Sequence, residues 1–149
     1  MTRLISAARF SLALACAVAA PAAWAADTEK GGYVTEDQST ESLISKAAVA
    51  AIWKDGLPEE RLQKLYPKAK WGFLSQVEGG MTSSQTCVVT ARVVMLPRTS
   101  PTRRLVWEPS KMSTTYDAKP GATPAQCSEL AAAKLKEALQ SLVTGLVKS

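Results

Sequence analysis

The chain has 149 residues, with 18 Lys and Arg against 13 Asp and Glu, a formal net charge of +5 and no histidine. The missing imidazole excludes Ser-His-Asp and Cys-His catalytic sites and removes the commonest metal ligand. The chain also contains no Cys-x-x-Cys-His haem motif and no phosphate-binding glycine loop. The sequence therefore predicts neither a metal nor a cofactor.

Residues 1–25 have the pattern of a secretory signal peptide. Arg3 and Arg9 precede a short apolar run at 10–20. Ala23-Trp24-Ala25 then provides a small-x-small cleavage site. The run is shorter than the roughly 20 residues that a spanning helix needs, which disfavours an uncleaved anchor. A lipoprotein cleaved at Cys16 is the other alternative. We expect an exported protein, periplasmic or secreted, of which residues 26–149 remain.

Cleavage changes both the charge and the cysteine count. It removes Arg3, Arg9 and Cys16, so the net charge falls to +3 and Cys87 and Cys127 remain. A small positive charge on an exported chain argues against nucleic acid as a partner. Two cysteines in an oxidising compartment predict a structural disulfide.

The first part of the exported chain is predicted to be helical. Residues 26–38 are polar and predict a flexible lead-in to a single domain at 39–149. Ser39 or Thr40 is a candidate N-cap for an amphipathic helix that continues to about residue 54. Pro58 can begin a second, short helix at 58–66.

The middle of the chain has the alternating pattern of strands. Residues 71–78 and 86–96 alternate, and the second run is rich in β-branched residues. Residues 103–108 predict a third strand, and residues 112–116 continue extended after a bend. A glycine pair at 79–80 and the segment 97–102 supply the connections.

The last predicted element is a helix at about 124–147, capped by Thr123 with Gln126 three residues later. The whole pattern predicts an α+β domain: an N-terminal helix with a short second helix, a three- to four-stranded antiparallel sheet, and a long C-terminal helix packed on the sheet. Cys127 in the first turn of that helix could reach Cys87 on the inner face of a strand.

The charge distribution indicates where a partner could bind. Residues 27–60 carry a net charge of −5 and residues 61–119 a net charge of +7. The basic residues flank one tryptophan, and the binding candidates are Arg98, Arg103, Arg104, Trp107 and Lys111. They fit an anionic envelope component or an acidic protein. The alternative is that Trp107 belongs to the core and the basic residues only solubilise a loop.

These observations favour a small, non-catalytic binding or accessory module of the cell envelope. The alternative activity is a carboxylate-dependent hydrolase of envelope polymers, with Glu78 and Glu108 as its acid pair. A third hypothesis is a structural protein that contacts only other copies of itself. No motif in the chain names the ligand.

Overall fold

The computed structural model describes residues 32–99, 102 and 104–148. The predicted leader at 1–25 and the candidate Arg103 lie outside these residues. The elements in chain order are β1 (Val34–Asp37), α1 (Lys46–Gly56), α2 (Glu59–Leu65), β2 (Trp71–Met81), β3 (Thr86–Pro97), β4 (Lys111–Pro120) and α3 (Pro124–Lys148). In the described part of the chain no helix is both long and apolar enough to cross a bilayer.

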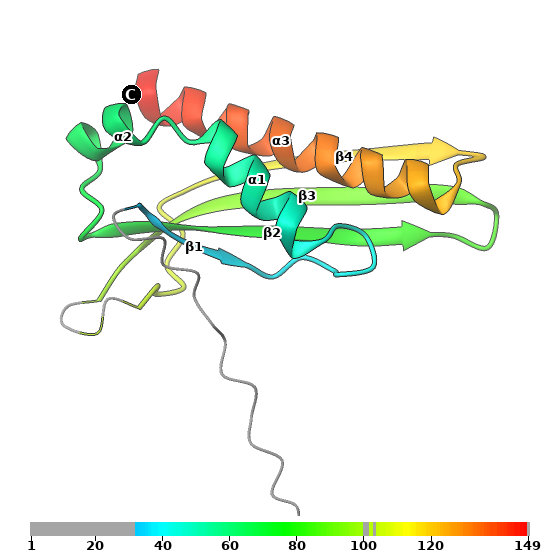
Figure 1. Ribbon diagram of the computed structural model, residues 1–149, viewed down its shortest axis with the longest axis horizontal. Coiled ribbons are helices and arrows are strands. Elements are labelled where there is room, and N and C mark those ends of the chain that lie inside the picture. The colour runs from blue at the N-terminus through cyan, green and yellow to red at the C-terminus, as the bar shows by residue number, and fades with distance from the viewer. Residues whose placement is uncertain (1–31, 100–101, 103, 149) are drawn as a thin grey trace, which may run out of the picture.

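The strands form one sheet in the order β1-β2-β3-β4, and the helices lie on one side of it (Figure 1). Strands β2, β3 and β4 are antiparallel, whereas β1 runs parallel to β2. The predicted α+β fold with a long C-terminal helix packed on the sheet is confirmed. The prediction of a purely antiparallel sheet is wrong, because the sheet is mixed.

Strand β1 lies within the segment predicted to be a flexible lead-in, so that prediction is wrong for residues 34–37. Polar hydrogen bonds hold the strand in place. The Asp37 carboxylate accepts from the backbone and the hydroxyl of Ser39 and from the hydroxyl of Ser75, at 2.6 to 3.2 Å. Beyond the strand, Gln38 N–H and Thr40 N–H donate to carbonyls of β2. These contacts depend on residues far along the chain, so the local polar sequence gives no strand pattern.

Helix α1 begins later than predicted, at Lys46. Its N-cap is Ser45, whose side chain accepts from Ala48 N–H. The two expected caps, Ser39 and Thr40, lie outside the helix. The Ser39 hydroxyl bridges Asp37 and the backbone N–H of Val77, and the Thr40 carbonyl accepts from the N–H groups of Leu43 and Ile44. The residues between form turns that bury Leu43 and Ile44.

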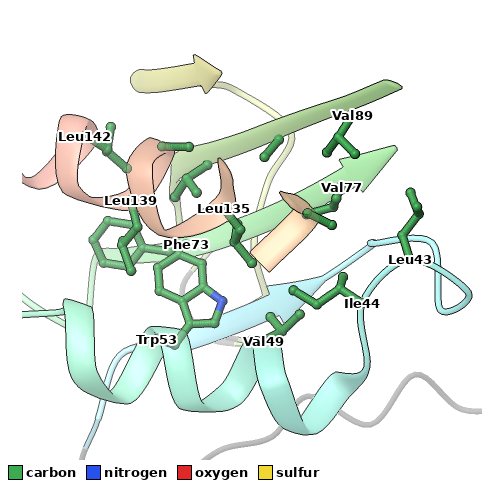
Figure 2. Packing of buried hydrophobic residues seen from close by; sticks show 14 of the residues in the cluster. Leu43, Ile44, Val49, Trp53, Phe73, Val77, Val89, Leu135, Leu139 and Leu142 are labelled. Carbon is green, nitrogen blue, oxygen red and sulfur yellow. The ribbon is translucent and has the colours of Figure 1, made fainter. Parts of the chain in front are cut away.

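The core lies between the sheet and the helices (Figure 2). Phe73 is fully buried at its centre, with the Tyr33 ring 5.1 Å and the Trp53 ring 5.8 Å away between centroids. The Trp53 indole donates to the hydroxyl of Ser75, the buried polar residue of this layer. The side chains drawn from each element include Val49 from α1, Val77 from β2, Val89 from β3, and Leu135, Leu139 and Leu142 from α3.

Helix α3 is fixed at its start by a cap and a disulfide. Gln126 N–H donates to the Thr123 hydroxyl, and Thr123 N–H donates to the Gln126 side chain, which completes the predicted capping box. Cys87, the second residue of strand β3, forms a disulfide bond with Cys127, and their Cα atoms are 5.5 Å apart. The predicted disulfide is confirmed, and it clamps α3 across the inner face of the sheet.

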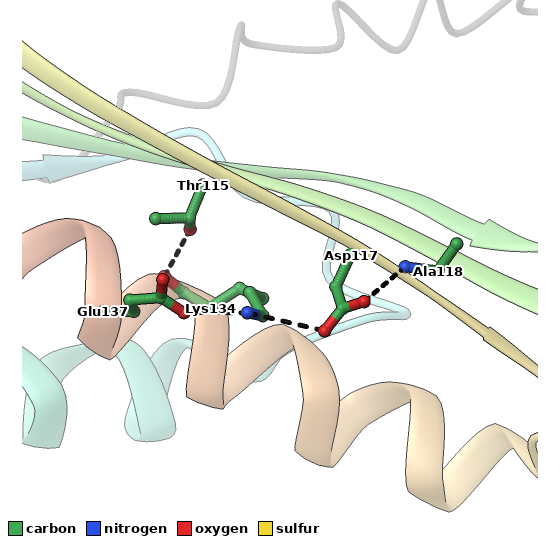
Figure 3. A network of polar contacts seen from close by, with 5 residues as sticks. All are labelled: Thr115, Asp117, Ala118, Lys134 and Glu137. Atoms are coloured by element: carbon green, nitrogen blue, oxygen red, sulfur yellow. Dashed lines mark hydrogen bonds and ion pairs between the residues drawn. The ribbon is translucent and has the colours of Figure 1, made fainter.

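Polar contacts attach the middle of α3 to strand β4 (Figure 3). The Thr115 hydroxyl donates to the Lys134 carbonyl at 2.8 Å. The Lys134 ammonium lies 2.8 Å from the Glu137 carboxylate and 3.4 Å from that of Asp117. The hydrogen bond to Glu137 is the main cause that raises the pKa of Lys134. A charged cluster therefore lies along the β4 side of the helix.

Candidate functional site

In the part of the chain that the structure describes, the helices cover one side of the sheet, and we call the other side the open face. Side chains alternate along a strand, so the residues beside Phe73, Val77 and Val89 point away from the core. Cross-strand register aligns them in rows. The described residues of this face include Gln76 and Glu78 of β2, Val88, Thr90, Arg92 and Val94 of β3, and Met112, Thr114, Tyr116 and Ala118 of β4.

The segment 98–110 covers one end of the open face. Leu105 packs on Leu74, Val94 and Leu96, which are buried in a small second core. A Cβ atom on Gly72 would come within 2.6 Å of the Leu105 side chain, so glycine is needed for this close approach. In Figure 1 the segment extends on the side of the sheet opposite the helices.

This segment is not the third strand that the sequence predicts at 103–108. The strand-like pairing among its described residues is limited to one isolated bridge between Arg98 and Leu105. Pro97 and Pro109 bound the excursion, and Ser110 N–H returns to the Met95 carbonyl. The next strand is instead β4, which is longer than the predicted 112–116.

Several large apolar side chains of the open face and of the 98–110 segment are exposed among the described residues. Tyr116 is 81% exposed, Trp107 61% and Met112 56%, and Val88 and Val106 are also exposed. Single exposed apolar residues are ordinary, but two highly exposed aromatic rings on the same side of a small domain are typical of an interaction surface. The exposure of Trp107 excludes the alternative that it belongs to the core.

The basic candidates have different environments. Arg104 is exposed on the 98–110 segment, as is Trp107. Lys111 is exposed at the start of β4, but alternation places it on the helix side of the sheet. Arg98 is half-buried, and its guanidinium donates to the Lys68 carbonyl, so it fastens the segment to the residues before β2. The structure therefore brings Arg104 and Trp107 together on one segment and gives Arg98 a structural contact.

Arg92 is a residue of this face that the sequence-based candidates omit. It lies on β3 between Gln76 and Thr114, and its buried Nε atom has no hydrogen-bond partner among the described residues. A buried donor without a partner is costly, which makes it a feature that needs an explanation. The alternation of 86–96 already places Arg92 on the outer face of the strand, so this part of the site was accessible from the sequence.

The two carboxylates of the alternative activity are not brought together. Glu78 pairs with Thr90, whereas Glu108 lies two residues before Ser110, which is bonded to Met95. The span from Thr90 to Met95 along β3 is about 17 Å. The Glu78 carboxylate accepts from the Gln76 amide at 2.8 Å. The backbone positions thus do not favour the close pair that glycoside hydrolysis requires.

In the described ranges no three or more Cys, Asp or Glu residues are grouped so that they could hold a metal ion. Carboxylates of this domain serve structural contacts instead. Glu59 pairs with Lys68 at 2.6 Å, and Asp37 anchors β1. The described residues of the open face include aromatic, apolar and guanidinium side chains.

Comparison with known proteins adds a weak structural similarity. No family model matches the sequence, and no curated protein matches it. Among solved structures, the chain is similar to protein XCC0632 from Xanthomonas campestris, described with the family model DUF330, at 20% identity and a TM-score of 0.24. The match covers 52% of this chain and 44% of that one, less than half of its length. A similarity at this level carries no argument about fold or function.

Proposed function

We propose that the protein is a small, exported, non-catalytic module of the cell envelope that binds a partner through the open face and the 98–110 segment. The observation that carries the proposal is the exposure of Trp107 and Tyr116 on the side of the sheet that no helix covers. Tryptophan, tyrosine and arginine are the residue types that dominate binding energy at interfaces.

The basic groups of this surface favour a partner with anionic groups. Arg104 is exposed three residues before Trp107, and the buried Nε–H of Arg92 on the open face has no partner among the described residues. The planar guanidinium group suits carboxylates and phosphates, because it donates two parallel hydrogen bonds. Glu78 lies at the other end of the face, so the loop end is where an anion is favoured. The ligand class is an anionic envelope component or an acidic protein.

The proposed compartment rests on the leader pattern at residues 1–25. The Cys87–Cys127 disulfide is consistent with it, because such bonds persist in oxidising compartments. Both observations support export without naming a partner.

The test is a co-purification of partners from an envelope extract with the tagged protein. The variant Arg104→Glu with Trp107→Ala should lose the partner that the wild type retains. The control Lys136→Glu with Leu65→Ala makes the same kind of changes at exposed positions of α3 and α2 and should retain it. Equal recovery of the partner by both variants would reject this surface as the site.

A second measurement separates the two ligand classes. Vesicles with anionic headgroups, matched neutral vesicles and an acidic protein are each tested for binding to the wild type. Binding to anionic vesicles identifies an envelope lipid, and binding to the acidic protein alone identifies a protein partner. Absence of any binding in all three arms and in the co-purification would contradict the proposal.

A further inference from the structure

Strand β4 is an edge of the sheet, and no described strand pairs with its outer side. It has 10 residues and lies at the end of the order β1-β2-β3-β4, whereas the opposite edge, β1, has only 4. Proline occurs in it only at the last position, Pro120. Its charged residues lie near its two ends, and the stretch 112–116 between them carries neither a charge nor a proline. A long edge with such a stretch presents a row of backbone groups that can pair with another strand.

The hydrogen-bond pattern identifies which groups of β4 are available. The carbonyls of Ser75 and Val77 in β2 accept from residues that continue β1, so odd-numbered residues of β2 face β1. Backbone bonding alternates along each strand, and the register is continuous through β3. Odd-numbered residues of β4 therefore bond to β3, and even-numbered residues direct N–H and C=O outward.

One of these outward groups is already satisfied. Ala118 N–H donates to the Asp117 carboxylate at 2.8 Å, which agrees with its outward direction (Figure 3). This bond closes the C-terminal end of the edge. The open template is therefore the stretch whose outward groups belong to Met112, Thr114 and Tyr116.

We propose that this edge pairs with β4 of a second copy of the chain, antiparallel and centred on Thr114. A two-fold axis at Thr114 places Met112 opposite Tyr116 of the second copy and Lys111 opposite Asp117 of the second copy. Met112 and Tyr116 are the exposed apolar residues of the strand, at 56% and 81%. Pairing covers them against each other and continues the sheet across both copies.

Charge complementarity selects this register. With Thr114 as a hydrogen-bonded pair, Lys111 and Asp117 occupy the non-hydrogen-bonded positions, where opposing Cα atoms are about 4.5 Å apart. Lys111 then joins the cluster of Asp117, Lys134 and Glu137 on the helix side. Moving the two-fold axis from Thr114 to Thr115 would place Lys111 opposite Lys119 of the second copy. Moving the axis to Ser113 would place Lys111 opposite Thr115 of the second copy, with no charge partner.

The first experiment removes one outward donor. Thr114→Pro deletes an N–H that the monomer does not use in its ladder, and proline is tolerated at edge positions of this kind. The purified wild-type protein should dimerise as its concentration rises, and sedimentation velocity measures this. Thr114→Val keeps the N–H and should keep the dimer, whereas Thr114→Pro should be monomeric with an unchanged circular dichroism spectrum.

The second experiment remains informative if the proline variant fails to fold. Thr114→Cys places two cysteines directly opposite each other, with Cα atoms about 5.5 Å apart, within disulfide range. Ala118→Cys is the matched control on the same edge, and the register separates it from its copy by about 27 Å. Mild oxidation should link only the Thr114→Cys dimer. A monomer at submillimolar concentration, a dimer that survives Thr114→Pro, or equal crosslinking of both variants would overturn the proposal.

The dimer and the proposed partner surface share Tyr116 but not the 98–110 segment, so changes in that segment test them separately. Arg104→Glu with Trp107→Ala changes the 98–110 segment and should leave sedimentation unchanged, because neither residue lies on β4. A monomer that instead pairs with an added strand-forming peptide would show that β4 accepts a foreign strand, and would also overturn the second-copy assignment.

Discussion

The two faces of the sheet are built from the same strands and yet have opposite characters. The covered face carries Phe73, Val77 and Val89, all fully buried beneath α1 and α3. The open face carries Thr90, Arg92, Met112 and Tyr116, and only its loop end is closed by Leu105. Successive side chains of a strand point to opposite faces. Every second residue of a strand therefore packs in the core, and the residues between them are available on the open face.

This difference predicts which substitutions affect folding and which affect binding. On the covered face, loss of volume leaves a cavity between rigid layers. On the open face, the same loss removes contacts only with solvent or with a partner. Free energies of unfolding and binding measurements should therefore separate the two faces.

The largest predicted effect is on the covered face. Phe73→Ala should lower the free energy of unfolding by about 3–5 kcal/mol, because its ring is fully buried between Tyr33 and Trp53. Tyr116→Ala should change it by no more than about 0.5 kcal/mol. Chemical denaturation at low protein concentration, where the chain is monomeric, measures both. Similar losses in the two variants would contradict the comparison.

The disulfide attaches the covered face to its helix. Replacement of both Cys87 and Cys127 by Ala should cost about 3–4 kcal/mol, from the entropy of a closed loop with a sequence separation of 40. Denaturation of the variant measures the loss, and reduction of the wild type should reproduce most of it. An unchanged denaturation midpoint in both cases would show that α3 is held by packing alone.

Much of the covered face could be predicted from the sequence. The apolar stripe of α3, the capping box at Thr123 and the alternation of β3 are local patterns, and the structure bears them out. Strand β1 could not be predicted, because Asp37 and Ser75 are 38 residues apart and their hydrogen bond exists only in the folded chain. The start of α1 was misplaced for the same reason, since Ser39 serves this contact rather than a cap.

The third predicted effect tests the closed end of the open face. Leu105→Ala should lower the free energy of unfolding by about 1–2 kcal/mol, because Leu105 is only partly buried on Leu74, Val94 and Leu96. Hydrogen exchange should be faster at Thr99, whose N–H donates to the Arg104 carbonyl, and at Val106, whose N–H donates to the Pro97 carbonyl at the end of β3. Unchanged exchange there would show that Leu105 does not hold the segment on the sheet.

The fourth predicted effect is a pH dependence on the covered face. Burial, reinforced by the nearby Glu59 carboxylate, raises the pKa of Tyr33 to about 12. The unfolded chain loses this proton near pH 10, so stability from the neutral phenol is present below pH 10 and is lost as the pH rises toward 12.

Tyr33→Phe provides the control. The substitution removes the hydroxyl that donates to the Tyr66 carbonyl, so it is expected to be less stable than the wild type at neutral pH. Between pH 10 and 12 the difference between the two proteins should shrink. A difference that stays constant over this range would contradict the raised pKa.

The candidate site was less predictable than the core. Composition drew attention to the basic residues around Trp107, and the structure exposes Arg104 and Trp107 while giving Arg98 a backbone contact. Tyr116 is not among the sequence-based candidates, because the sequence does not show that β4 is an edge strand whose open face no described helix covers. Exposure depends on which elements are absent from a face, and no local pattern records that.

The Cys87–Cys127 bond has a consequence for proteolysis. The chain between the two cysteines contains most of β3, the whole 98–110 excursion and β4. Exposed excursions of this kind are preferred sites for proteases. A single cut there separates the polypeptide into two fragments that stay covalently joined, so a nicked protein migrates as one species until it is reduced. Cleavage of the segment that we propose for recognition therefore leaves the two parts of the domain covalently linked.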